Sequence, residues 1–281
     1  MPNTPPFPQG LRTRIAPTPS GFLHPGNGAA FVLTHRLAHD NGGRVLLRID
    51  DLDAERLRPE YVQDIFDTLA WLKVKWEDGP RDVQDFTKNW SQGLRMPRYQ
   101  ALLEQLAAAG HLYACTCSRK ELSSCECRHQ DRPVDLPEAT LRLRIPIGCK
   151  VTFNTWPHGP RTVDLSRMMP DPVLRQRPLK DLPGRPAYQI ASLADDVHYR
   201  IDLVVRGEDL LPSSACQVYL AGLLGLDGFT RTLFVHHALL GDANGGKLSK
   251  SQGAGSLKAM RDEDEGPELI LGLAHQLQQE L

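Results

Sequence analysis

Four of the six cysteines in this sequence lie within thirteen residues, as Cys115, Cys117, Cys125 and Cys127. Cysteine thiolates are soft ligands, and four of them can enclose a zinc ion tetrahedrally. Such a closed site stabilises a short segment that has little hydrophobic core of its own. The cluster therefore predicts a structural zinc site, with free thiols or a redox pair as the alternatives.

A second candidate site is the segment 16–27, which reads Ala-Pro-Thr-Pro-Ser-Gly-Phe-Leu-His-Pro-Gly-Asn. It precedes a predicted helix, and backbone N–H groups at a helix N-terminus favour phosphate. We expect His24 to pack against a nucleotide there, and Gly21, Gly26 and Gly28 to let the backbone approach it closely. A turn rich in glycine and proline, without a ligand, is the alternative.

A third candidate is Lys247-Leu-Ser-Lys-Ser251, which follows Asp-Ala-Asn-Gly-Gly. Lysines and hydroxyls on a loop hinged by glycine can follow a phosphate and neutralise the charge that develops on it. Taken alone, such a segment is also typical of a solvated surface loop.

The elements that would position these residues alternate between strand and helix. Apolar periodicity predicts a strand at 12–16, a helix from about Asn27, a strand at 44–50 and a helix from Pro59. The same pattern resumes with a helix from Tyr188, a strand at 201–205, a helix near Pro212 and a strand at 233–235. Between these halves lie a helix around Leu102–Leu106 and two alternating stretches, 140–145 and 151–156, which indicate antiparallel strands with one wet face. We predict an α/β fold, a Rossmann-type doubly wound parallel sheet, with an inserted α+β segment that contains the zinc site.

Composition narrows the class of protein. The 281 residues include 33 basic and 34 acidic side chains, which gives a formal net charge of -1. The chain is therefore not uniformly basic, and a polyanion would have to bind a local basic patch. Apolar runs are too short to cross a membrane, and the first residues lack the features of a signal peptide. We expect a cytoplasmic protein without membrane association and see no sign of an obligate protein partner.

The two loop motifs together resemble the signatures of class I aminoacyl-tRNA synthetases, and their detail is similar to the glutamyl branch. The matching stretches are Arg14–Gly26, Leu47–Asp53, Val204–Leu210 and Lys247–Ser251. Full-length glutamyl-tRNA synthetases append an anticodon-binding domain where only 30 residues follow Ser251 here. A core without that domain, with Cys-x-Cys just after Gly-His-Leu-Tyr, resembles the glutamyl-queuosine tRNA(Asp) synthetases. The resemblance implies ATP-dependent activation of L-glutamate without tRNA, and transfer to the queuosine in the anticodon loop of tRNA(Asp).

The resemblance also implies a glutamate site. Arg14 would pair with a substrate carboxylate, Tyr188 would close over the amino acid, and Arg206 would select a side-chain carboxylate over an amide. Three residues depart from the usual pattern, because the family has serine, glutamate and asparagine where this chain has Thr18, Asp50 and Ser192. Local alternatives remain open: Asp50 with Asp51 as a strand-end ion pair, Tyr188 as core, and Arg206 paired with Glu208 or Asp209.

For ATP, accompanied by Mg²⁺, the resemblance implies a site made of His24, Gly26, Asn27, Lys247, Ser249 and Lys250. We expect His24, Lys247 and Lys250 to be catalytic residues that stabilise charge, because phosphoryl-type transfer depends mainly on positioning the reactants and neutralising their charge. In the family a tyrosine usually completes the zinc site. By spacing, Ser123 occupies its place, so Cys125 is expected as the fourth ligand and His129 is the alternative.

The resulting domain organisation has four parts. We expect a flexible N-terminal tail at 1–11, a catalytic domain in two halves at 12–95 and 186–251, an inserted segment resembling an acceptor-binding domain at 96–185, and a short helical C-terminal remnant at 252–281. Arg119, Lys120, Arg128 and Arg132 are candidates for contact with the anticodon loop, although a solvated face is equally compatible. The rival functions are a small-molecule nucleotidyltransferase, a ligase with an acceptor other than tRNA, and a non-catalytic zinc-stapled RNA-binding module.

Overall fold

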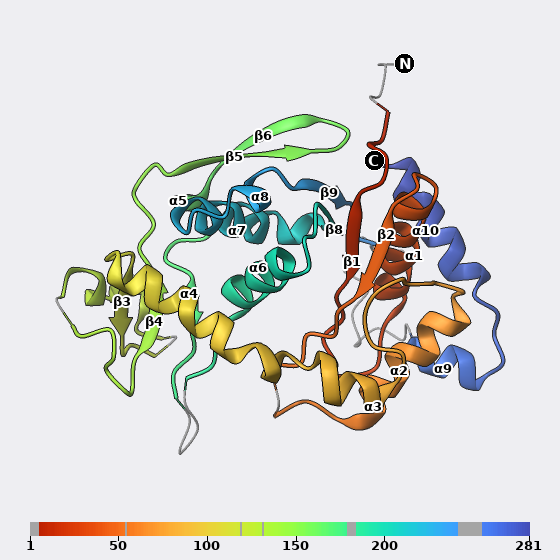
Figure 1. Ribbon diagram of the computed structural model, residues 1–281, viewed down its shortest axis with the longest axis horizontal. Helices are drawn as coiled ribbons and strands as arrows, with labels where there is room; N and C mark the ends of the chain where they lie inside the picture. Colours follow the sequence, from red (N-terminus) through yellow and green to blue (C-terminus); the bar gives the residue numbers. More distant parts are fainter. Residues whose placement is uncertain (1–5, 54, 119, 131, 179–183, 241–254) are drawn as a thin grey trace.

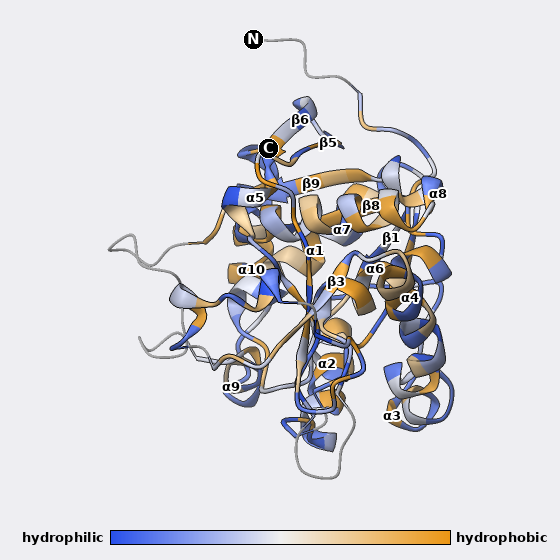
Figure 2. Ribbon diagram, turned by 90° about the vertical axis from the view of Figure 1, so that its left-hand side faces the viewer, coloured by the Kyte–Doolittle hydropathy of each residue, from blue (hydrophilic) through white to orange (hydrophobic). Residues whose placement is uncertain are grey.

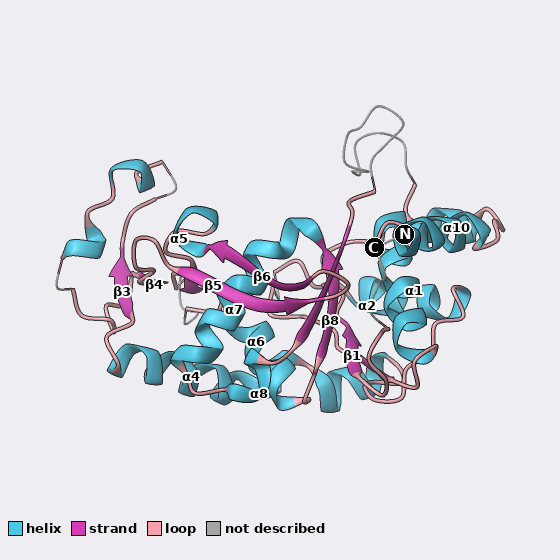
Figure 3. Ribbon diagram, turned by 90° about the horizontal axis from the view of Figure 1, so that it is seen from above, coloured by secondary structure: helices cyan, strands magenta, loops and turns pink. Residues whose placement is uncertain are grey.

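A computed structural model gives the arrangement of the chain (Figure 1). It describes residues 6–53, 55–118, 120–130, 132–178, 184–240 and 255–281. Seen from above, the molecule is elongated, with β3 near one end and α1 and α10 at the other (Figure 3).

The first strand–helix–strand–helix unit matches the prediction. Its elements are β1 (Arg12–Ile15), α1 (Pro25–His39), β2 (Arg44–Leu47) and α2 (Pro59–Trp71). The two strands are parallel, with Arg12 opposite Arg44 and Ile15 opposite Leu47. Val45, Leu46 and Leu47 are fully buried, as expected for a parallel strand covered by helices on both faces.

The second α/β unit lies beside the first. It consists of α6 (Tyr188–His198), β8 (Leu203–Gly207), α7 (Leu211–Leu223), α8 (Asp227–Thr230) and β9 (Leu233–His237). Strands β8 and β9 are parallel, and β8 lies next to β1 because Thr13 Oγ1 donates to the Leu203 carbonyl at 2.9 Å. The apolar residues concentrate on β8, β9 and α7 in the interior (Figure 2). The predicted α/β fold with parallel strands is confirmed.

The segment between the two units begins with short helices and one long one. These are α3 (Val83–Asp85), η1 (Phe86–Trp90), η2 (Gln92–Arg95) and α4 (Met96–Ala108). Helix α4 leads away from the α/β units toward a small antiparallel sheet in the order β3–β4–β7 (Figure 1). The elements of that region are β3 (Leu112–Cys115), η3 (Leu122–Ser124), η4 (Cys127–His129), β4 (Thr140–Leu143) and β7 (Val173–Arg175).

A hairpin of β5 (Lys150–Thr155) and β6 (Gly159–Asp164), followed by α5 (Leu165–Met168), also comes from this stretch of sequence. The alternation of exposed and buried residues along β5 confirms the predicted strand with one wet face. Strand β5 pairs antiparallel with β6 but parallel with β9, with Asn154 opposite Leu233. The hairpin therefore extends the sheet of β8 and β9, although its residues fall within the range expected for the inserted segment.

The C-terminal helices α9 (Leu257–Asp262) and α10 (Glu268–Gln279) pack on the first unit. A Cβ atom at Gly28 would lie 2.9 Å from side-chain atoms of both Leu257 and Ile270. Glycine at this position of α1 is thus required for helix packing, whereas the sequence suggested close approach of a ligand. None of the helices in the described part of the chain combines the length and the apolar character that a membrane crossing requires.

Candidate active site

Four of the expected glutamate-site residues line one cavity, two from the segments after β1 and β2 and two from α6. The Arg48 N–H donates to the Ile15 carbonyl, and the Asp50 N–H donates to the Pro17 carbonyl, each at 2.9 Å. These bonds hold Asp50 beside Thr18. The cavity, of about 250 Å³, is lined by these two residues and by Tyr188 and Ser192. The last two lie one turn apart on α6, so they share a helix face.

A second cavity, of about 270 Å³, brings together His24, Gly26, Asn27 and Arg206. Asn27 Oδ1 accepts a hydrogen bond from the His24 backbone N–H at 3.1 Å, which fixes the start of α1. A third cavity follows the loop itself, and its lining includes Thr18 from the first cavity and both His24 and Asn27 from the second. Residues expected for the amino acid and residues expected for the nucleotide therefore line cavities that share lining residues along this loop.

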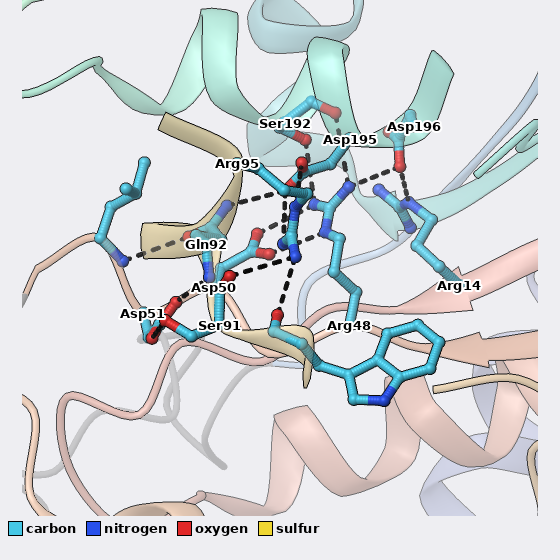
Figure 4. Close-up of polar contacts among 12 residues, drawn as sticks. Arg14, Arg48, Asp50, Asp51, Ser91, Gln92, Arg95, Ser192, Asp195 and Asp196 are labelled. Atoms are coloured by element: carbon cyan, nitrogen blue, oxygen red, sulfur yellow. Dashed lines mark hydrogen bonds and ion pairs between the residues drawn. The ribbon is translucent and has the colours of Figure 1, made fainter. Parts of the chain in front are cut away.

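A network of buried charges adjoins the first cavity, which three of its residues, Asp50, Gln92 and Ser192, also line (Figure 4). Asp196 of α6 pairs through Oδ1 with Arg14 Nε of β1 at 3.2 Å and with Arg48 Nη1 at 2.6 Å. All three residues are at most 5% exposed. Because Arg14 is already paired with Asp196, a substrate carboxylate would have to share its guanidinium with that residue.

Asp50 is engaged as well. Arg48 donates Nε to Asp50 Oδ1 at 2.7 Å and Nη2 to Asp50 Oδ2 at 2.9 Å, and Nη2 also reaches Ser192 Oγ at 3.2 Å. Burial raises the pKa of Asp50 despite the opposing effect of Arg48. Although burial alone would lower the pKa of Arg48, the carboxylates of Asp50 and Asp196 raise it well above its usual value. Arg48 lies within the matched stretch Leu47–Asp53, but sequence reasoning assigned it no role.

Asp195 is the centre of a second half of this network, and the sequence analysis assigned no role to it. It pairs with Arg95 Nε at 2.7 Å and accepts from the Tyr99 hydroxyl at 2.8 Å and from Gln92 Nε2 at 2.9 Å. Asp51, considered as a partner in a strand-end ion pair, instead accepts from the Ser91 hydroxyl at 2.6 Å. The contacts of Asp195 join α6 to η2 and α4, and Gln92 of this group lines the first cavity.

Arg206 near the end of β8 is buried at 5% exposure. Its Nη2 donates to Gln217 Oε1 at 2.9 Å, while Nε and Nη1 have no hydrogen-bond partner among the described residues. Burial lowers the pKa of Arg206 to about 10, so the side chain stays cationic at neutral pH. Glu208, one of the alternative partners, pairs with Arg161 at 2.9 Å. The remaining ATP-site residues of the sequence analysis, Lys247, Ser249 and Lys250, lie outside the described residues.

The four clustered cysteines converge as predicted. Their Sγ atoms all lie within 4.8 Å of one another, with the Cys115–Cys125 and Cys117–Cys127 pairs at 3.6 Å. A tetrahedral zinc ion with Zn–S bonds of about 2.3 Å would place its sulfurs about 3.8 Å apart, so the set fits zinc. Burial alone would raise the pKa of Cys127, but hydrogen bonds from the Thr116 backbone and neighbouring thiols lower it to about 7. Among the described residues, His129 is not part of this group, which favours Cys125 as the fourth ligand.

Two of the basic residues considered for an anticodon loop have internal partners. Arg128 pairs with Asp171 and donates Nη2 to the Ile145 carbonyl at 2.8 Å. Arg132 donates to Thr116 Oγ1 at 2.5 Å. Lys120 is exposed, and Arg119 lies outside the described residues.

Comparison with known proteins gives a consistent result. Residues 10–142 match the family model of the catalytic domain of class I tRNA synthetases (E and Q). Curated relatives include the glutamyl-Q tRNA(Asp) synthetase of Geobacter sulfurreducens, 36% identical over 93% of this chain and 82% of that protein. The enzyme of the same name from Rhodobacter capsulatus is 33% identical over 91% of this chain and 96% of that protein.

A solved structure has the same fold. The glutamate-tRNA synthetase of Elizabethkingia anophelis superposes with a TM-score of 0.70 at 26% identity. The match covers 86% of this chain but only 53% of that protein. The structural match thus includes most of this chain but only about half of the longer enzyme.

Proposed function

The chain belongs to the glutamyl-Q tRNA(Asp) synthetase family of class I aminoacyl-tRNA synthetase-like ligases, and on this premise we propose that it activates glutamate with ATP and transfers the glutamyl group to queuosine in tRNA(Asp). The structural observation that carries the proposal is the shared lining of the three cavities around the loop 16–27. It brings candidate amino-acid ligands and candidate nucleotide ligands to adjoining spaces.

In the first step, a carboxylate oxygen of glutamate attacks the α-phosphorus of ATP, and the bond to pyrophosphate breaks. We assign Tyr188, Thr18, Asp50 and Ser192 to the amino acid, since they line one cavity. Arg14 and Arg206 supply positive charge, the latter from the wall of the second cavity. The reaction gains most from holding the two reactants in line, because there is little covalent chemistry for the protein to perform.

The nucleotide is assigned to the second cavity. His24, Gly26 and Asn27 lie at the start of α1, where backbone N–H groups and the helix dipole favour phosphate. Lys247, Ser249 and Lys250 complete the proposed site and neutralise the phosphates. Mg²⁺ accompanies ATP and contributes further charge neutralisation when bound.

In the second step, a hydroxyl of the acceptor nucleoside attacks the acyl carbon, the bond to AMP breaks, and the hydroxyl proton passes to the departing phosphate. Unstacked bases of a loop can be splayed into a pocket and read there. We propose that the inserted segment 96–185 contacts the anticodon loop, with zinc holding residues 115–127 in place. Exposed Lys120 is a better candidate for this contact than Arg128, whose guanidinium is committed to Asp171. ATP and tRNA as substrates favour a cytoplasmic location.

The proposal is tested by the position of the transferred label. Purified protein is incubated with ATP, radiolabelled glutamate and tRNA(Asp) that contains or lacks queuosine, and the product is mapped with nucleases. We expect label only on the queuosine-containing tRNA, at the wobble nucleotide. Label on the 3′-terminal adenosine, or on tRNA that lacks queuosine, would refute the assigned acceptor.

A further inference from the structure

Arg206 is a buried cation that forms no ion pair with any described carboxylate. Its guanidinium lies over the ring of Phe234, with Cζ 5.6 Å from the centroid, and its one hydrogen-bond acceptor among the described residues is Gln217 Oε1. Buried charges are normally paired with an opposite charge, because an unpaired one is costly to desolvate. The two unpartnered donors, Nε and Nη1, thus indicate an anion that is supplied from outside the fold. Arg206 lines the second cavity and interacts electrostatically with Tyr188 of the first, so an anion held between the two cavities can reach it.

Gln217 holds this cation without cancelling its charge. The side chain lies on α7 and is fully buried. Its amide orientation follows from chemistry, since only the oxygen can accept from a guanidinium. The neighbouring His236 is also neutral: Ser214 Oγ lies 2.7 Å from its Nε2, and burial lowers the pKa of the imidazole to about 3. The Gln217 amide and the Phe234 ring contact the guanidinium and the nearby imidazole is neutral, so none of these three groups cancels its charge.

We propose that Gln217 is a specificity-determining residue, whose neutral amide orients Arg206 while leaving its positive charge for the side-chain carboxylate of the substrate. This inference rests on the proposed function. A carboxylate at position 217 would satisfy the same hydrogen bond and would also neutralise the guanidinium. The site would then lose its preference for an anionic side chain, even though Arg206 itself were unchanged.

Two substitutions of Gln217 test separately the effect of charge at this position and the effect of its hydrogen bond to Arg206. Gln217→Glu retains an oxygen acceptor and adds the charge, so we expect affinity for L-glutamate to fall at least about tenfold while affinity for L-glutamine stays within about threefold. Gln217→Met is neutral and of similar size but has lost the acceptor. It should weaken glutamate binding by roughly tenfold yet preserve the preference for glutamate over glutamine.

Binding of each amino acid is measured by titration calorimetry, and thermal unfolding verifies that each variant is folded. Gln189→Glu is the matched control, because Gln189 is also a buried glutamine, and its side-chain hydrogen bonds within the described residues, such as the one to Ser213 Oγ at 3.0 Å, do not involve Arg206. That control should keep the glutamate preference of the parent protein.

The outcomes are distinct. An unchanged preference in folded Gln217→Glu overturns the role of Gln217, whereas a parent protein that binds no glutamate overturns the proposed function and this inference with it. If Gln217→Glu does not fold, Gln217→Met decides: glutamate affinity equal to that of the parent overturns the inference, and weakened binding with retained preference supports it.

Discussion

Replacing Asp196 with asparagine tests the buried network most directly. The carboxylate is fully buried and pairs with Arg14 and Arg48. Breaking a buried pair by removal of one partner costs about 3–5 kcal/mol, because a buried charge is left uncompensated. Arg48 would keep its two bonds to Asp50, so the loss falls chiefly on Arg14. We therefore expect the free energy of unfolding to fall by about 3 kcal/mol, the lower end of that range.

The loss is measured by urea denaturation at neutral pH, with thermal unfolding as a second measurement. For a chain of this length about 2 °C corresponds to 1 kcal/mol, so Asp196→Asn should lower Tm by roughly 6 °C. Asp262→Asn is the control, since Asp262 pairs with Lys258 on the surface of α9 and its side chain is 60% exposed. That change should cost less than about 0.5 kcal/mol. A loss below about 1 kcal/mol in Asp196→Asn would show that the network does not stabilise the fold as argued.

Purified protein should carry about one zinc ion per chain by elemental analysis, and a fresh, reduced sample without zinc would contradict the metal assignment. The Cys115→Ser variant should bind less metal and be cleaved faster by proteases within residues 110–130, while it still forms the adenylate. Because the pKa of folded His236 is about 3, below its unfolded value near 6.5, the unfolded state binds more protons in that window, and stability is lost as pH falls. The loss should approach about 1.4 kcal/mol per pH unit below pH 6, and His236→Gln should flatten the slope in acid titrations of unfolding. Gly28→Ala should destabilise by about 1–2 kcal/mol through overpacking against α9 and α10, whereas Gly222→Ala on an open face of α7 should be neutral or stabilising in the same urea assay.

The sequence was sufficient to predict the alternation of strands and helices, because apolar periodicity is a local property of each segment. It was also sufficient to predict the convergence of the cysteines, which lie within thirteen consecutive residues. Thr18, Asp50, Tyr188 and Ser192 were expected to act together, and they do line one cavity; their roles stay proposals.

The contacts that sequence reasoning missed join distant positions. The bond between Arg48 and Asp196 spans 148 residues, and no local pattern distinguishes that aspartate from a solvated one. The same limitation explains the parallel pairing of β5 with β9 and the packing role of Gly28, because each depends on a partner in a later part of the chain.

Strands β1 and β8 lie side by side although they are far apart in the sequence, and this affects how the protein can fold while it is synthesised. The hydrogen bond from Thr13 to the Leu203 carbonyl spans 190 positions, and the Asp202 N–H reaches the Arg12 carbonyl at 3.0 Å. A nascent chain that emerges from the ribosome can form β1, α1 and β2 early, but one side of β1 has no neighbour until residues near 203 have been made. An unpaired strand edge is a template for aggregation, and long-range pairing is slow to form. The edge of β1 that β8 covers in the folded protein is therefore open to non-native pairing during most of translation.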